Sequence, residues 1–208
     1  NSLNTPSYYE FLHEMKIPLT NGAPVAVTTL GWTSLQRPYL ADLLSAKYYL
    51  TKNSTVTPEN VRFIKRIGDI FLYERLEALP FGFTYDSYIG RGKFFSTENG
   101  DKRDSLLLRG FLPPNSGGEA IFNKLSEASY KDMDGKELRE NLVSNTLNII
   151  QFSDDFIEGE ISLEKDKLLF LSIPYDIGWR ATVNGEELKI YKVNVGFWGI
   201  RLSKGNNR

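Results

Sequence analysis

Residues 168–183 read LLFLSIPYDIGWRATV, and this stretch decides the fold. Leu168 to Ile173 is apolar at nearly every position, as expected for a strand that is covered on both faces. Asn184-Gly185 follows directly and supplies the positive φ angles of a two-residue type I′ turn. The stretch therefore predicts a buried strand, a short loop and an antiparallel hairpin.

Further strand patterns lie on both sides of this stretch, from Thr146 to the end of the chain. In one of them Ile157, Ile161 and Leu163 share a face, and Glu164 to Asp166 is expected to close that strand against the next. The predicted strands cover residues 147–152, 156–163, 168–173, 179–183, 188–193 and 197–202. Half-buried strands beside a fully covered one predict an antiparallel β-sandwich over residues 144–208.

Residues 1–143 form a mixed α/β part. Thr5-Pro6 is a capped helix start, and the apolar spacing that follows predicts a helix to about Lys16. Gly68-Asp69 separates two apolar runs and predicts a hairpin near residues 61–75. Further helices are expected at 38–44, 102–109 (capped by Asp101), 119–126 and 134–143, and further strands at 25–30, 47–51 and 81–85. The fold class is therefore α+β, as two parts or one compact unit.

The composition is that of an ordinary globular protein. The 208 residues are 41% hydrophobic, and 25 basic against 26 acidic side chains give a net charge of −1, so no global field attracts nucleic acid. The absence of cysteine excludes disulfides and Cys-based zinc sites. No apolar run approaches the about 20 residues of a membrane helix. Both ends are abrupt, and we expect them to be the boundaries of a piece cut from a longer chain.

Motifs for catalysis, cofactors or metals are missing. The single histidine, His13, falls on the polar face of the first helix, and no phosphate loop or metalloprotease pattern occurs. We expect no catalytic residue, no metal and no cofactor in this chain. Charge clusters expected to be solvated surface are Asp132/Asp134, Asp154/Asp155, Glu186/Glu187 and the basic helix face of Lys102, Arg103 and Arg109.

Aromatic side chains crowd the last strands and are the most informative site candidates. An aromatic plane beside carboxylate or amide groups is a typical surface for a sugar ring. The carbohydrate-binding candidates are Tyr175, Asp176, Trp179 and Trp198. Core packing is the competing interpretation: it is favoured for Trp179, which shares a face with Ala181 and Val183, and is evenly weighted for Tyr175 and Trp198.

A longer motif carries a family resemblance. The segment from Leu169 to Trp179, the Ala181 to Gly185 hairpin, Gly196-Phe197 and the closing Leu202 to Gly205 resemble, in order and spacing, the bacterial membrane-protein family YfhO. Weaker similarity occurs at residues 2–4, 43–49, 72–74 and 78–83, so that the resemblance spans nearly the whole chain. Catalytic acids of such proteins are expected in loops between membrane helices, and none of those helices is present here.

The resemblance implies a multi-spanning protein with a glycosyltransferase-C-like membrane core. Such a protein would use a polyprenyl-phosphate sugar to decorate cell-envelope polymers such as lipoteichoic acid of Gram-positive bacteria. This chain would be its soluble domain on the extracellular face of the cell membrane, with the parent's transmembrane core and a glycopolymer as partners.

Three hypotheses follow for this domain. It assists acceptor binding or positioning, or it is a purely structural or protein-interaction domain without a ligand. The third, a free-standing hydrolase, requires two carboxylates converging at about 5–10 Å.

Overall fold

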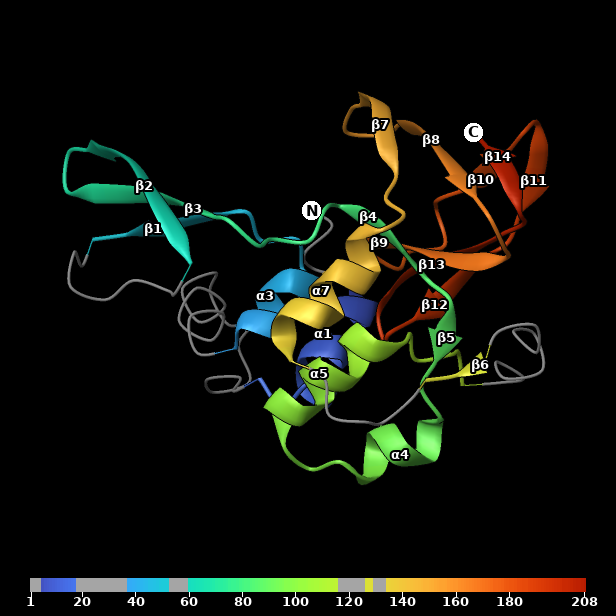
Figure 1. The fold of residues 1–208 in the computed structure, drawn as a ribbon, viewed down its shortest axis with the longest axis horizontal. Coiled ribbons are helices and arrows are strands. Elements are labelled where there is room, and N and C mark those ends of the chain that lie inside the picture. The colour runs from blue at the N-terminus through green and yellow to red at the C-terminus, as the bar shows by residue number, and fades with distance from the viewer. Residues whose placement is uncertain (1–4, 18–36, 53–59, 116–125, 129–133) are drawn as a thin grey trace.

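The computed structural model describes residues 5–17, 37–52, 60–115, 126–128 and 134–208. Within them, a central antiparallel sheet is covered by helices on one face and by a second β layer on the other, and a three-stranded arm projects from one side (Figure 1). Helices and antiparallel strands thus occur together, which confirms the predicted α+β class.

The central sheet has the order β12-β13-β9-β4 and is formed by β12 (Ile190–Val193), β13 (Phe197–Leu202), β9 (Lys167–Pro174) and β4 (Gly82–Tyr85). Side chains of a strand alternate between its two faces. Leu168 and Phe170 accordingly belong to the helix-side core, whereas Leu169 and Leu171 belong to a second core beneath the other β layer. The prediction that this strand is covered on both faces is confirmed.

Strand β4 connects the two predicted parts of the chain. It pairs antiparallel with β9, from Gly82 opposite Leu171 to Tyr85 opposite Leu168. Phe83 of β4 contacts Phe170 of β9 with ring centroids 5.0 Å apart. Residues from both parts therefore share one core, while the division near residue 143 stays a prediction about domains.

The helical layer consists of α1 (Pro6–Glu14), α3 (Pro38–Leu43), α5 (Gly100–Arg109) and α7 (Gly135–Val143), with α4 (Arg91–Ser96) beside them. Thr5 caps α1 as predicted, because its hydroxyl accepts from the Tyr8 amide. Phe11 of α1 meets Phe197 of β13 edge-on, with ring centroids 4.7 Å apart. This contact anchors α1 on the central sheet.

Two predictions about α5 are wrong. Its cap is Asn99, whose Oδ1 accepts from the Lys102 amide at 3.0 Å, and not Asp101. The predicted solvated basic face does not extend to Arg103, which is 3% exposed and donates to the Thr97 and Phe95 carbonyl oxygens. A local charge pattern could not reveal these acceptors, since they are backbone carbonyl oxygens at the end of α4 and just after it.

Sheet β14-β8-β7 and the β10–β11 hairpin form the second β layer. The strands are β7 (Asn148–Phe152), β8 (Ile157–Leu163), β10 (Ala181–Val183), β11 (Glu186–Leu188) and β14 (Gly205–Asn207). Asn184 and Gly185 have φ angles of 52° and 86°, as the type I′ prediction requires. The predicted pairing through residues 164–166 is wrong: β8 pairs with β7 and β14, so this turn crosses from one sheet to the other.

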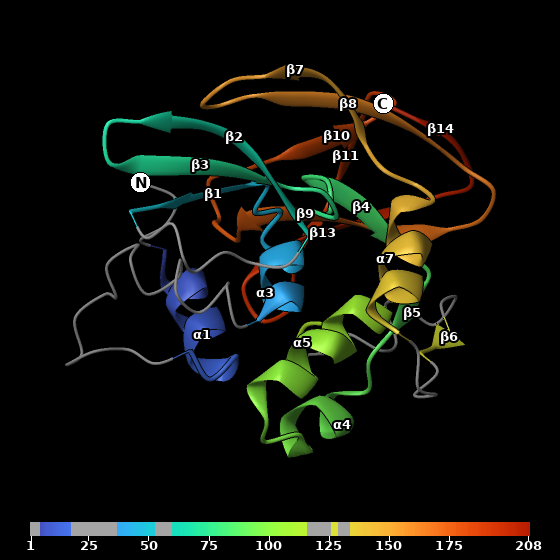
Figure 2. The same cartoon turned by 60° about the vertical axis from the view of Figure 1, so that its left-hand side comes forward.

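The arm is a separate sheet of order β1-β3-β2, made of β1 (Tyr48–Thr51), β2 (Val61–Ile67) and β3 (Ile70–Arg75) (Figure 2). The hairpin predicted near residues 61–75 is confirmed, with Gly68 at a φ of 61°. A short parallel pair, β5 (Ser87–Tyr88) and β6 (Ser126–Glu127), lies elsewhere. The predicted strand 25–30 and residues 119–125 of a predicted helix lie outside the described residues.

A buried carboxylate holds the base of the arm. Asp42 of α3 is fully buried and accepts from Arg75 of β3 at 2.8 Å and from Arg139 of α7 at 2.7 Å. Burial raises the pKa of Asp42 above its ordinary value, against the opposing effect of the two guanidinium groups. This cluster ties α3, α7 and the arm together.

Candidate functional site: an aromatic cleft between two β layers

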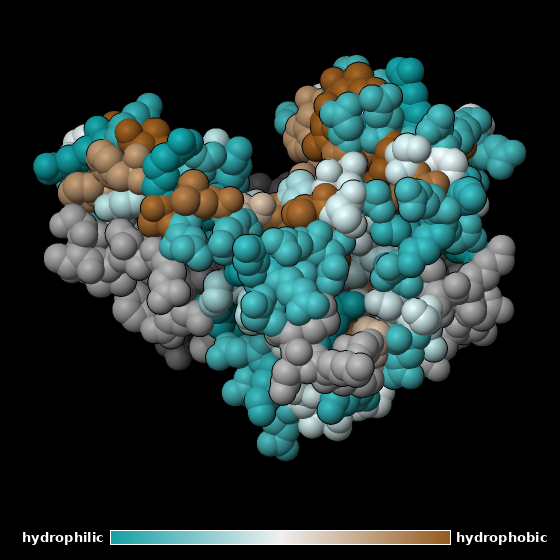
Figure 3. All heavy atoms as spheres, viewed as in Figure 1, coloured by the Kyte–Doolittle hydropathy of each residue, from teal (hydrophilic) through white to brown (hydrophobic). Residues whose placement is uncertain are grey.

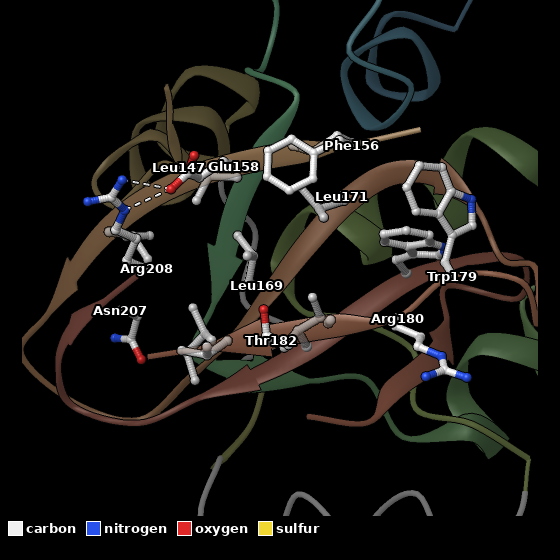
Figure 4. Close-up of a pocket in the computed structure, with 18 of the residues that line it drawn as sticks. Leu147, Phe156, Glu158, Leu169, Leu171, Trp179, Arg180, Thr182, Asn207 and Arg208 are labelled. Carbon is white, nitrogen blue, oxygen red and sulfur yellow. Dashed lines mark hydrogen bonds and ion pairs between the residues drawn. The ribbon is translucent and has the colours of Figure 1, made fainter. Parts of the chain in front are cut away.

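A cleft of about 510 Å³ opens between the central sheet and the second β layer (Figure 4). Leu169 and Leu171 of β9 and Trp198, Ile200 and Leu202 of β13 line it from the central sheet. Strand β8 contributes Ile157, Gly159 and Ile161, and the β10 segment contributes Trp179 to Val183. A concave, mostly apolar site with polar groups at its edge is the usual form of a small-molecule site.

The alternation of β9 and β13 produces this apolar surface. In β13, Phe197 belongs to the helix-side core, and Trp198, Ile200 and Leu202 belong to the core on the cleft side. The pairing with β9 shifts register between Phe197 and Trp198. Because β9 is apolar on both faces, it supplies side chains to the helix-side core and to the cleft.

Trp179 and Trp198 meet in the cleft. Their ring centroids are 4.9 Å apart at an interplanar angle of 75°, an edge-on contact. Trp198 is only 4% exposed and its Nε1 has no hydrogen-bond partner among the described residues, whereas Trp179 is half-buried. A buried donor without an acceptor is unfavourable, so Nε1 is an unused hydrogen-bonding group.

The other two candidates from the sequence are placed differently. Tyr175 packs against the same core but is not among the cleft-lining residues, and its amide donates to the Gly196 carbonyl at 2.7 Å. Asp176 is exposed, and its Oδ1 accepts from the Gly178 amide at 2.9 Å, which shapes the loop before Trp179. The structure brings Trp179 and Trp198 together in the cleft, and a carbohydrate role for all four residues stays a prediction.

Charged residues at the two ends of the cleft were missed by the sequence analysis. At one end Arg208 pairs with Glu158 through Nε at 2.9 Å and Nη2 at 2.7 Å; at the other, Arg180 stands beside Trp179 (Figure 4). Arg180 is exposed and makes no ion pair or hydrogen bond with the described residues. Its position directly after Trp179 was the available signal.

The two acidic residues that line the cleft, Asp155 and Glu158, are each engaged by another side chain. Glu158 is held by Arg208, and Asp155 accepts from the Ser153 hydroxyl at 3.0 Å. Among the described residues no group of histidine and carboxylate side chains could hold a metal ion. His13 and the described members of the three acidic pairs are exposed, as predicted. The hydrolase hypothesis gains no support from these contacts.

Fold and site together define an α+β domain with an aromatic cleft whose form is suited to binding. Residues 136–208, which contain every cleft-lining residue, match the family described as bacterial membrane protein YfhO. Over 45 residues the chain is 42% identical to the uncharacterized protein YfhO of Bacillus subtilis (strain 168), a stretch that covers 22% of this chain and 5% of that protein. The C-terminal third of the chain is thus similar to the YfhO family of bacterial membrane proteins.

Three further findings define the extent of this similarity. The chain spans a small part of the length of that relative, and the similarity expected over nearly the whole chain is matched over residues 136–208. No solved structure matches the chain significantly. In the part of the chain that the structure describes, no helix has the length and apolar character needed to cross a membrane.

Proposed function

We propose that the chain is the extracellular domain of a membrane-embedded glycosyltransferase that decorates cell-envelope polymers such as lipoteichoic acid from a polyprenyl-phosphate sugar donor. The transmembrane core of the parent protein carries out the transfer, and this domain binds and positions the acceptor polymer in the cleft. The similarity of residues 136–208 to the YfhO family of bacterial membrane proteins supports the membrane context. The cleft supports the binding role.

The observation that carries the proposal is the combination of Trp179, Trp198 and Arg180 at one end of an apolar cleft. The C–H faces of a sugar or a polyol stack on an exposed indole, and a guanidinium group binds phosphate oxygens in bidentate fashion. Arg180 has no competing partner among the described residues. A ligand oxygen that reached Nε1 of Trp198 would satisfy the buried donor.

The test is calorimetric titration of the chain with poly(glycerol phosphate) fragments and with simple sugars. Arg180→Gln is expected to weaken binding of the phosphate polymer about tenfold or more, because it removes a charge-assisted hydrogen bond. Trp179→Ala removes the stacking surface, and Trp198→Phe removes the unpaired N–H while it keeps an aromatic ring in the core.

The matched control is Arg62→Gln, which changes an exposed arginine of the arm that pairs with Glu74. It is expected to leave binding unchanged. Absence of saturable binding at millimolar ligand, with every variant folded by circular dichroism, would rule out acceptor binding by this domain.

A second candidate function is a structural or protein-interaction domain that contacts the parent's own transmembrane core. It is favoured by the exposed apolar side chains of Ile149, Ile150 and Phe152 on β7, an edge strand of its sheet. In the full-length parent, Ile150→Glu would then impair assembly or activity and leave ligand binding by the isolated chain intact. An unchanged full-length protein would remove the support for this candidate.

A further inference from the structure

The arm has no buried position in any of its strands. All residues of β1, β2 and β3 are half-buried or exposed. Leu50 is 60% exposed, Phe63 53% and Ile67 55%. Figure 3 shows apolar residues on the arm and on the β7–β8 lobe, with a hollow between them. Contiguous exposed apolar surface on a protein usually marks a contact with another surface.

The register of the arm distributes these side chains over both of its faces. Tyr49 and Phe63 both lie opposite Tyr73, and the ring centroid of Tyr73 is 6.3 Å from that of Tyr49 and 5.5 Å from that of Phe63. On the other face Leu50 lies opposite Leu72, and the hairpin ends with Ile67 opposite Ile70. A rigid protein partner would cover only one face of the arm. Apolar groups on both faces are better suited to a tip that enters a fluid layer, which can surround it.

Basic side chains surround this apolar tip. Residues 47–52 and 60–75 carry six basic side chains, Lys47, Lys52, Arg62, Lys65, Arg66 and Arg75, against the two acidic side chains Asp69 and Glu74, a net charge of +4, whereas the whole chain has −1. Arg75 is neutralised by Asp42 at the base of the arm. Lys65 makes no ion pair or hydrogen bond with the described residues. The exposed part of the arm is thus positive.

The outer strand β2 is poorly suited to pairing with a strand of another protein. Strands β1 and β2 are the edges of the sheet. Strand β2 carries Arg62, Lys65 and Arg66, and its pairing with β3 is interrupted by a register shift between Phe63 and Lys65. Edge lysines and bulges are features by which proteins prevent strand addition. The apolar surface is therefore better explained by a lipid interface than by β-augmentation.

We propose that the arm docks on the surface of an anionic lipid bilayer. In membrane proteins, aromatic rings and the aliphatic stems of lysine and arginine occupy the headgroup layer of the bilayer. The charged groups of lysine and arginine stay hydrated there. Phe63, Ile67 and Leu50 enter that layer, and Lys65 and Arg66 face the lipid phosphates. The Asp42 cluster fixes the arm to the helices, so that docking also orients the rest of the domain.

The β7–β8 lobe provides an internal comparison for this proposal. It exposes Ile150 and Phe152 to a similar degree, but its neighbouring charges are acidic: Asp154, Asp155, Glu158 and Glu160. An anionic surface repels this lobe. Ile67 and Ile150, 55% and 48% exposed, therefore form a matched pair with opposite surroundings.

The experiment is sedimentation of the 208-residue chain with vesicles of equal parts phosphatidylglycerol and phosphatidylcholine, and with phosphatidylcholine alone. We expect binding to the anionic vesicles that weakens as salt rises. Lys65→Gln lowers partitioning about fivefold, which is the contribution of one basic side chain near an anionic surface. Ile67→Ser and Phe63→Ser lower it as well, and Ile150→Ser leaves it unchanged.

Three results would overturn the proposal: no sedimentation with anionic vesicles, equal binding to both vesicle types, or arm variants that bind like the unmodified chain. Thermal unfolding of each variant confirms that a loss of binding is not a loss of fold. Loss of cleft ligand binding in Arg180→Gln would leave these results unaffected, so the membrane proposal and the acceptor proposal fail separately.

Discussion

Strands β2 and β9 have comparable sequence signals for strand formation and opposite environments. Strand β9 is buried at every position except Ser172, between helices on one face and the second β layer on the other. Strand β2 is exposed at every position after Val61. The comparison shows that apolar periodicity predicts a strand, whereas its burial depends on which elements pack against it.

The largest expected difference between the two sheets comes from removing a ring. Phe170→Ala should lower the free energy of unfolding by about 4 to 5 kcal/mol, because it leaves a cavity in the core. Phe170 is 1% exposed and its ring contacts those of Phe83, Tyr85 and Phe197. Phe63→Ala in the arm should change the free energy of unfolding by no more than about 0.5 kcal/mol. Urea unfolding of both variants measures the comparison, and equal effects would contradict it.

The next effect concerns the junction of arm and helices. Asp42→Asn should lower the free energy of unfolding by about 3 kcal/mol, since it leaves the largely buried Arg75 without its counter-charge and Arg139 with Glu77 alone. Asp69→Asn, which removes the exposed partner of Lys52 at the tip, should leave the urea midpoint unchanged. If Asp42→Asn left the free energy of unfolding unchanged, the arm would not be held through this carboxylate.

The two regions are also expected to respond oppositely to pH. Burial raises the pKa of Asp104 to about 6, despite the Arg37 guanidinium 2.6 Å away, whereas Lys52 and Arg62 lower the pKa values of Asp69 and Glu74 in the arm. Since folded Asp104 holds its proton more tightly than unfolded Asp104, its contribution is full below about pH 4 and is lost as pH rises to about 6.

This loss amounts to at most about 3 kcal/mol, from a shift of about two pKa units. Asp104→Asn should flatten the curve of unfolding free energy against pH between about 4 and 6. The arm carboxylates contribute with the opposite sign, as they are lost when pH falls, but their exposure leaves that contribution small. A slope that persists in Asp104→Asn would assign the titration to another group.

The smallest expected effect is the same in both regions. Gly68 in the β2–β3 turn and Gly185 in the β10–β11 turn have positive φ angles, with open space where a Cβ would lie. Gly68→Ala and Gly185→Ala should each lower the free energy of unfolding by about 1 kcal/mol, because the left-handed conformation is unfavourable for alanine. Equal losses of unfolding free energy in the two variants would show that the cost of the substitution depends on the turn itself and not on what packs against its strands.

Particular elements show how far the sequence could be interpreted. The hairpin near residues 61–75, the doubly covered β9 and the Asn184-Gly185 turn follow from local rules of periodicity and backbone conformation, and the structure confirms them. The turn at residues 164–166 was assigned to a hairpin, but the choice between closing a hairpin and crossing between sheets depends on partners distant in sequence. The cap of α5 is predicted at Asp101 and lies at Asn99; both residue types cap helices well, and the backbone at the helix start decides between them.

The candidate site shows the same division. The sequence identified Trp179 and Trp198 as residues of interest, because aromatic side chains near a loop are conspicuous. It could not show that they meet, that Tyr175 and Asp176 lie outside the cleft, or that Arg180 and the Glu158–Arg208 pair stand at its ends. These relations depend on the packing of one β layer on another.

By itself, the sequence determined the doubly covered strand β9, the turns at Gly68-Asp69 and Asn184-Gly185, the α+β class and the family similarity of residues 136–208, since each depends on residues close together in the chain. The tertiary structure alone decided that the strands of the arm have no buried position, that β4 joins β9, and that a cleft forms between the two β layers. The physical reason is that burial and pairing arise from contacts between distant segments, and alternation along a strand specifies two faces without specifying what covers them.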